Sequence, residues 1–354
     1  MKKFIESILQ ASDMKEHYAY LDEKAAEDPL ELVEIFKVLP KDWIKLLNSW
    51  QQRAAYSRIL EAVCLTAGKD QIKAAIQIAD MVEREKDFDR TAAFLVAKQD
   101  RDELLALLVS SNAEKSRALL TLVIHELVAH GEDLRKSSHL AFLERTNQAS
   151  SFKSLSLFPL ESEQKNSFPT FGIGTSGSSI DYTLESVFEN FNRNEKVEIS
   201  EYTEGNGIAL ALLNWEEASN GKILGLRGKT KLESSPEGIL ASLQAFEEDR
   251  TFQIHQEEHT DIVRFLFSAS SKGGAYNSGI FGAKGRLHTW TSLSRMMGDL
   301  EFSSNEEVER KMKDYHWFRF TTSEWFQNEI WDLGILCVKK NGLEFGLIAG
   351  TDID

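Results

Sequence analysis

The sequence is poor in cysteine, with only Cys64 and Cys337 among its 354 residues. The two lie far apart, so the chain lacks the spacing of a disulfide framework or of a cysteine-based zinc site. This usage is typical of a reducing compartment, and we expect a cytoplasmic protein. No apolar run approaches the roughly 18 residues of a transmembrane helix. The short apolar stretch near the first residue is interrupted by Glu6, so we do not expect a signal peptide.

Basic residues are also scarce relative to acidic ones. The chain holds 41 Lys and Arg against 56 Asp and Glu, a net charge of −15. Nucleic acids and anionic membrane surfaces are bound by cations, so this balance argues against both as partners. The hydrophobic fraction of 42% is that of a globular protein with a buried core, and the length suggests two or three domains.

Glycine is nearly absent from the first 150 residues, where only Gly68 and Gly131 occur among the 21 in the chain. Because glycine is disfavoured in helix interiors and favoured in turns, we expect an all-helical N-terminal domain and a loop-rich C-terminal one. Asp28 before Pro29 and Asp100 before Arg101 are predicted helix caps. Six to eight short antiparallel helices would form an irregular solenoid-like array over residues 1–148.

Residues 149–182 contain many serines and two prolines, and we interpret them as a linker. The remainder, 183–354, is predicted to be a glycine-rich α+β domain with a small antiparallel sheet. Candidate strands are 197–202, 223–226, 252–254 and 318–320, with helices over 262–267 and 286–297. The clearest feature is Asn341-Gly342 between two apolar runs, which predicts a hairpin over 335–349. The fold class is therefore α+β.

A glycine-rich segment, 273–285, joins the two predicted helices and is the candidate ligand site. Free backbone N–H groups at a helix start favour an anion, and cations and aromatic rings lie nearby. One hypothesis is a phosphorylated small molecule; the alternative is that the glycines only permit a tight helix crossing. The predicted ligand-binding residues are Gly273, Gly274, Tyr276, Gly279, Lys284, Arg286, His288 and Trp290.

A second candidate is the segment from His255 to His259, which fits the inverted zinc-protease pattern H-x-x-E-H. If the segment were helical, the two histidines would share a face, and Glu258 would be placed to act as general base. Residues 251–254 alternate like a strand, however, which favours a solvated polar helix start instead. A metal-dependent hydrolase is thus an alternative reading, and we assign no metal ligand or catalytic residue.

The C-terminal quarter also carries a resemblance to a known family. GGAY at 273–276, GRL-x-x-W-x-SL from Gly285, EWF at 324–326, WDLG at 331–334 and the final TDID recur in this order. Over about residues 270–354 the chain resembles an uncharacterised bacterial family of unknown function. The resemblance implies a bacterial origin and a coherent domain, but no reaction.

These observations favour a non-catalytic binding protein over an enzyme. There is no P-loop and no G-x-S-x-G nucleophile elbow, and we expect no cofactor. Residues 151–354 hold 20 of the bases and 31 of the acids, so −11 of the charge lies there. We expect another protein as the partner, with a basic surface that the acidic chain neutralises, as in immunity or defence. The oligomeric state stays open.

Overall fold

The computed structural model describes residues 2–39, 50–82, 84–111, 114–164, 196–249, 251–275, 279–327 and 331–352. The chain divides into two compact units, which are described separately. The helical unit comprises the described residues of 1–127 and 136–150. The sheet unit comprises those of 128–135, 151–170 and 176–354. No helix in the described ranges is long and apolar enough to cross a membrane.

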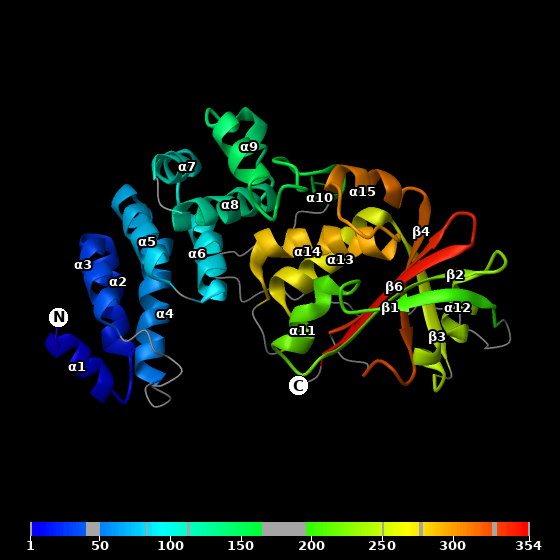
Figure 1. Cartoon of the computed structure of the whole chain (residues 1–354). Helices are drawn as coiled ribbons and strands as arrows, with labels where there is room; N and C mark the ends of the chain where they lie inside the picture. The colour runs from blue at the N-terminus through cyan, green and yellow to red at the C-terminus, as the bar shows by residue number, and fades with distance from the viewer. Residues whose placement is uncertain are drawn as a thin grey trace. The chain divides into compact units, whose positions relative to one another are not determined.

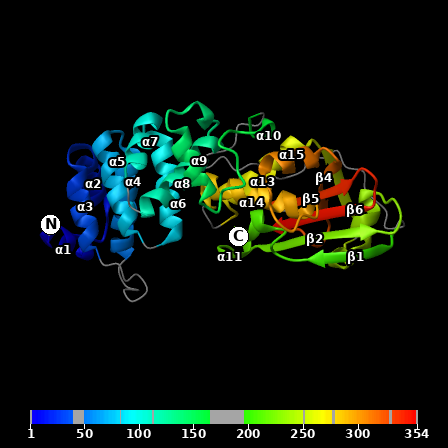
Figure 2. The same cartoon turned by 45° about the horizontal axis from the view of Figure 1, so that its top comes forward.

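The helical unit is an array of antiparallel helices (Figures 1 and 2). In one row α2 contacts α4 and α4 contacts α6; in the other α3 contacts α5 and α5 contacts α7. This two-row stacking confirms the predicted solenoid-like architecture. The helices are α1 (Lys2–Gln10), α2 (Lys15–Glu27), α3 (Pro29–Val38), α4 (Trp50–Leu65), α5 (Lys69–Met81), α6 (Glu85–Lys98), α7 (Arg101–Ser110), α8 (Glu114–Ala129) and α9 (Leu140–Gln148). The last two residues of α8 and most of the 3₁₀ turn η1 (Leu134–Lys136) belong to the sheet unit.

Both predicted caps of the helical unit are present. The Asp28 carboxylate accepts the N–H of Glu31 at 3.3 Å, and the Asp100 carboxylate accepts that of Glu103 at 2.9 Å. Each bond satisfies one of the backbone donors that a helix leaves open at its first turn. These short-range signals therefore begin α3 and α7 where the sequence predicts.

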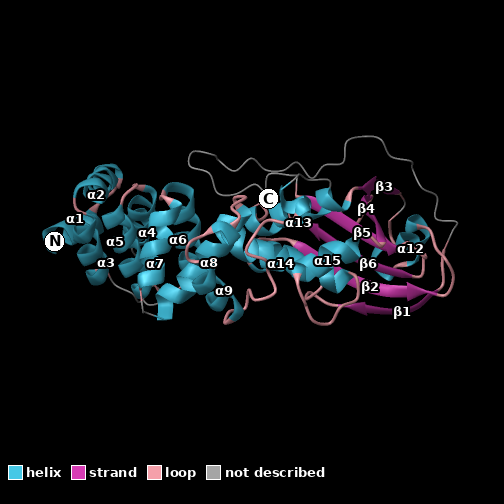
Figure 3. Cartoon of the chain, turned by 90° about the horizontal axis from the view of Figure 1, so that it is seen from above, coloured by secondary structure: helices cyan, strands magenta, loops and turns pink. Residues whose placement is uncertain are grey.

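The sheet unit is built on six antiparallel strands in the order β1-β2-β6-β5-β4-β3, seen side by side in Figure 3. The predicted hairpin is confirmed as β5 and β6, with the N–H of Leu343 bonded to Oδ1 of Asn341 in the turn. The β6 strand is the last described strand in sequence but lies inside the sheet. The strands are β1 (Ile199–Glu204), β2 (Lys222–Thr230), β3 (Phe252–Glu257), β4 (Tyr315–Thr322), β5 (Asp332–Lys339) and β6 (Glu344–Thr351).

Helices cover both faces of this sheet. On one face α14 contacts β2 and β6, and α13 contacts β4. On the other, α12 and η3 close an apolar core in which Phe246 makes edge contacts with Phe320 and Trp325 at 5.7 and 5.9 Å. The helices of this unit are α10 (Glu161–Gln164), η2 (Leu210–Leu212), α11 (Leu213–Glu217), α12 (Pro236–Ser242), η3 (Gln244–Phe246), α13 (His259–Lys272), α14 (Phe281–Met296) and α15 (Asn305–Met312).

The described part of the predicted linker, residues 149–164, differs from the expectation. Residues 151–164 belong to the sheet unit, and Leu155 and Leu160 are buried. The N–H of Asn305 bonds to the carbonyl of Ser154, and the Asn305 side chain accepts the N–H of Ser156. Residues far along the chain thus satisfy a backbone that local composition reads as flexible. The rest of the predicted linker, 165–182, lies outside the described residues.

Candidate functional site

The predicted glycine loop is shorter than the sequence suggests. The α14 helix begins at Phe281 rather than near Arg286, so Lys284, Arg286, His288 and Trp290 all lie within it. Small size explains why glycine is helical here, since a Cβ on Gly285 would lie 2.9 Å from that of Ser271 in α13. Gly273, Gly274 and Gly279 remain in the connection, whereas Tyr276 lies outside the described residues.

Arg286 is the residue on which the predicted anion site depended, and it is fully buried. Its guanidinium donates from Nε to Oε1 of Glu163 at 2.6 Å and from Nη2 to Oε2 at 3.0 Å. Two further bonds reach the carbonyl and the hydroxyl of Ser156, each at 2.9 Å. A carboxylate of the same chain therefore occupies the position in which the sequence analysis expected an anionic ligand.

Trp290 belongs to the same buried cluster, because its indole Nε1 donates to Oε1 of Glu163 at 2.8 Å. The structure thus brings together two of the predicted ligand residues, but as internal partners of Glu163. Lys284 and His288 lie on the same helix and are half-buried. No local signal could have identified Glu163, which is in the predicted linker and 123 positions from Arg286.

The H-x-x-E-H segment does not form one helix. His255 lies in β3 opposite Arg319, Glu258 precedes α13, and His259 is its first residue. The two histidines therefore share no helical face, which the zinc hypothesis requires. Within the described ranges, no group of three or more His, Cys, Asp or Glu side chains is arranged to hold a metal ion. The strand predicted from the alternation of residues 251–254 is confirmed, since β3 runs from Phe252 to Glu257.

Both cysteines are inside the protein, and we predict that neither reacts in the native state. Burial raises the pKa of the Cys64 thiol well above its ordinary value and that of Cys337 to about 12. Since the thiolate is the reactive form, a chromogenic disulfide reagent at neutral pH should modify neither thiol in the folded chain and both in guanidinium. Prompt modification of one thiol in the folded protein would contradict this and identify an activated cysteine.

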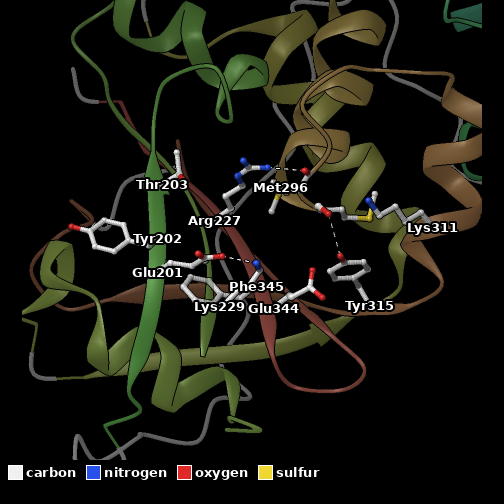
Figure 4. Close-up of a pocket in the computed structure, with 13 residues that line it drawn as sticks. Glu201, Tyr202, Thr203, Arg227, Lys229, Met296, Lys311, Tyr315, Glu344 and Phe345 are labelled. Atoms are coloured by element: carbon white, nitrogen blue, oxygen red, sulfur yellow. Dashed lines mark hydrogen bonds and ion pairs between the residues drawn. The ribbon is translucent and has the colours of Figure 1, made fainter. Parts of the chain in front are cut away.

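The sheet unit contains a groove of about 680 Å³ at a different place from both predicted sites (Figure 4). It lies where α14 ends and leaves part of the sheet face uncovered. Strands β1, β2, β4 and β6 supply one side of it, and the end of α14 and α15 supply the other. Its lining residues are Glu201, Tyr202, Thr203, Arg227, Gly228, Lys229, Met296, Met297, Gly298, Lys311, Tyr315, Glu344 and Phe345.

The end of α14 is fixed to the sheet by two side chains of the groove. Nη1 of Arg227 donates to the carbonyl of Gly298 at 2.7 Å, and the Tyr315 hydroxyl donates to that of Met297 at 3.2 Å. The last carbonyls of a helix lack intrahelical partners and carry partial negative charge, so a cation is favourable there. Burial raises the pKa of Tyr315 far above its ordinary range, which keeps its hydroxyl protonated as a donor.

The charges that line the groove are of both signs. Lys229 pairs with Glu201 at 2.5 Å across β1 and β2, and Lys311 pairs with Asp299 at 2.6 Å. The hydrogen bond from Lys229 lowers the pKa of Glu201, and the same bond raises the pKa of Lys229. The Lys229–Glu201 pair is exposed to solvent, where such pairs contribute little and exchange readily with other charged groups. A charged partner can therefore compete for either side chain.

Met296 and Met297 are buried at the inner end of the groove, whereas the Phe345 side chain packs in the apolar core on the opposite face of the sheet. The accessible lining of the groove is therefore mainly polar. Methionine is flexible and polarisable, so it adapts to differently shaped apolar groups. This groove was not predicted from the sequence. Its lining comes from six elements spread over residues 201–345, and no short motif marks any of these residues as part of a site.

The fold and the groove together define an α+β protein with a helical array and a six-stranded antiparallel sheet. The chain belongs to DUF6183, a family of unknown function whose model matches residues 16–354. The predicted resemblance to an uncharacterised family is thus confirmed, and the match extends into the helical unit as far as residue 16. No curated protein and no solved structure was found to be similar to the chain.

Proposed function

We propose that the protein is a non-catalytic binding protein that engages another protein through the groove of Figure 4. The observation that carries this proposal is the composition of the groove, a mainly polar lining that carries both signs of charge, with two methionines at its inner end. Protein interfaces have polar rims of this kind around a smaller apolar centre. Lys229 pairs with Glu201, and Glu344 pairs with Lys339. Pairs of this kind can exchange for contacts with a charged partner.

The charge of the chain supports a basic partner. Residues 151–354 carry −11 of the total −15, and a field of one sign speeds the encounter with a partner of the other sign. We place this role in the bacterial cytoplasm, with which two buried free thiols are compatible. Neutralising a basic toxin or effector, as immunity and defence proteins do, is the use that fits this charge best.

The test is capture of a partner by the tagged full chain from the organism that encodes it, quantified by mass spectrometry. The groove variant is Glu344→Lys, since Glu344 lines the groove and its side chain is 35% exposed. The matched control is Glu248→Lys, which makes the same charge change at an exposed position that does not line the groove.

We expect one protein to be enriched by the wild type and by Glu248→Lys. Its recovery with Glu344→Lys should fall about tenfold, the effect of losing roughly 1.4 kcal/mol of binding free energy, because the new cation repels a basic partner. Equal recovery with all three chains would exclude the groove as the binding site. Recovery of the bait alone under several growth conditions would overturn the proposal.

A further inference from the structure

The outer edge of β1 is the most exposed strand edge of the sheet unit. This strand ends the sheet on one side, and five of its six residues are exposed. Tyr202 has 54% of its surface exposed, a high value for a large side chain, and projects from β1 away from α14 in Figure 4. A strand edge presents unpaired backbone donors and acceptors to another chain.

The direction of these backbone groups follows from the ladder between β1 and β2. The N–H of Gly205 bonds to the carbonyl of Gly225, so it points into the sheet. Because successive N–H groups of a strand point to opposite sides, those of Glu204 and Tyr202 point out of the sheet. Both are therefore placed to pair with an added strand.

Acidic residues lie three apart along this edge, with Glu201 and Glu204 in β1 and Glu198 one residue before it. The pairing register shifts between Ile199 and Glu201, so only Glu201 and Glu204 lie in one regular stretch of the strand. Lys231 pairs with Glu198, and Lys229 pairs with Glu201. Within the described part of the chain, no ion pair involves Glu204. Residues three apart in a strand point to opposite faces, so this edge is acidic on both faces of the sheet.

We propose that an extended basic segment of the partner adds to the sheet as a strand beside β1, with cations at every third residue. This inference rests on the proposed function and specifies the partner. Main-chain hydrogen bonds supply affinity in such strand addition, and side-chain contacts supply specificity. Opposite charges directly across two strands are favourable and like charges are unfavourable, so a second copy pairing through its own β1 is disfavoured.

The probe is a fluorescent peptide, Lys-Val-Thr-Lys-Val-Thr-Lys, titrated with the full chain and followed by fluorescence anisotropy. Its spacing is the same in both directions, so it matches β1 as a parallel or an antiparallel strand. The control peptide carries Glu in place of each Lys. We expect the basic peptide to bind, the acidic one to show no binding, and added salt to weaken the interaction.

Two variants separate strand addition from attraction by charge. Tyr202→Pro removes an outward N–H and leaves the ladder to β2 intact, whereas Tyr202→Thr keeps that N–H. Binding of the basic peptide should weaken about tenfold in Tyr202→Pro and change by less than about threefold in Tyr202→Thr. Equal affinities for the two variants, each with a wild-type melting curve, would overturn strand addition.

The charge pattern is tested by Glu204→Lys, which should weaken the basic peptide and strengthen the acidic one. Glu248→Lys, at an exposed acid outside β1, should leave both affinities unchanged. Equal changes in peptide affinity for Glu204→Lys and Glu248→Lys would overturn the specific role of β1. Light scattering measures the oligomeric state of the wild type and of Tyr202→Pro. A wild-type dimer that becomes a monomer in Tyr202→Pro would show instead that a second copy of the chain occupies the edge of β1.

The outcomes also distinguish this inference from the proposed function. A cellular partner that is lost from Glu344→Lys but bound normally by Tyr202→Pro would support the groove and overturn strand addition. Discrimination between the two peptides without any captured partner would support the strand site and count against the groove as a protein-binding site.

Discussion

The Arg286→Ala variant is expected to lose about 3–5 kcal/mol of the free energy of unfolding of the sheet unit. Arg286 and Glu163 are both almost completely removed from solvent, and their side chains form a two-pronged ion pair. Deleting the guanidinium leaves the Glu163 carboxylate buried, with the N–H groups of Trp290 and Leu160 as its remaining donors among the described residues. An uncompensated charge in the interior is among the most destabilising changes known for a single residue.

Denaturant unfolding followed by tryptophan fluorescence measures this loss, because Trp290 reports directly on the cluster. The control is Arg310→Ala, which removes an arginine of α15 with three quarters of its side chain exposed and should leave the midpoint unchanged. The double variant Arg286→Met with Glu163→Met should be less damaging than Arg286→Ala, since it removes both charges and retains apolar volume. A midpoint of Arg286→Ala equal to that of the wild type would show that the pair does not form.

The second large effect is expected at Gly346, where β6 passes beneath the end of α14. A Cβ at this position would lie 2.2 Å from the carbonyl oxygen of Met296, so Gly346→Ala forces a helix backbone away from the sheet. Forced overpacking of this kind costs about 1–3 kcal/mol, and we expect the upper end because the obstacle is backbone. The same displacement separates the Met297 and Gly298 carbonyls from Tyr315 and Arg227, which disrupts the groove.

Gly205→Ala is the matched control for this substitution, because a Cβ there would have no neighbour within 4 Å. Its stability should equal or slightly exceed that of the wild type, since alanine restricts the unfolded chain. Gly346→Ala should lower the melting temperature and also reduce partner capture. Wild-type stability of Gly346→Ala would mean that α14 does not approach β6 as closely as described.

Much of the fold was predictable because its signals are local. The capping aspartates start their helices, the Asn341-Gly342 turn makes its hairpin, and each predicted strand overlaps an observed one. These features depend on neighbours within a few residues. Strand order was not predictable, because the pairing of β2 with β6 joins residues more than 100 positions apart and leaves no periodic pattern.

The partner of the arginine in the candidate ligand site was not predictable either, because it is distant in sequence. Arg286 follows glycines and a lysine, a context that locally resembles an anion site at a helix start. Arg286 binds an internal acid rather than a ligand because the fold places Glu163 next to it. Glu163 belongs to the serine-rich segment that was predicted to be a linker. The groove was not predicted because its lining residues come together only when strands and helices that are distant in sequence pack against each other.

The position of β6 in the sheet has a consequence for synthesis of the protein. During translation β1 and β2 emerge early, and β3, β4 and β5 follow, but the two groups remain unjoined until residues 344–351 have left the ribosome. Until then β2 and β5 each present an open edge of unpaired backbone groups, the type of surface on which nascent chains aggregate. Chains truncated before Glu344 would therefore need chaperones, whereas chains that continue through Thr351 can complete the sheet after they leave the ribosome.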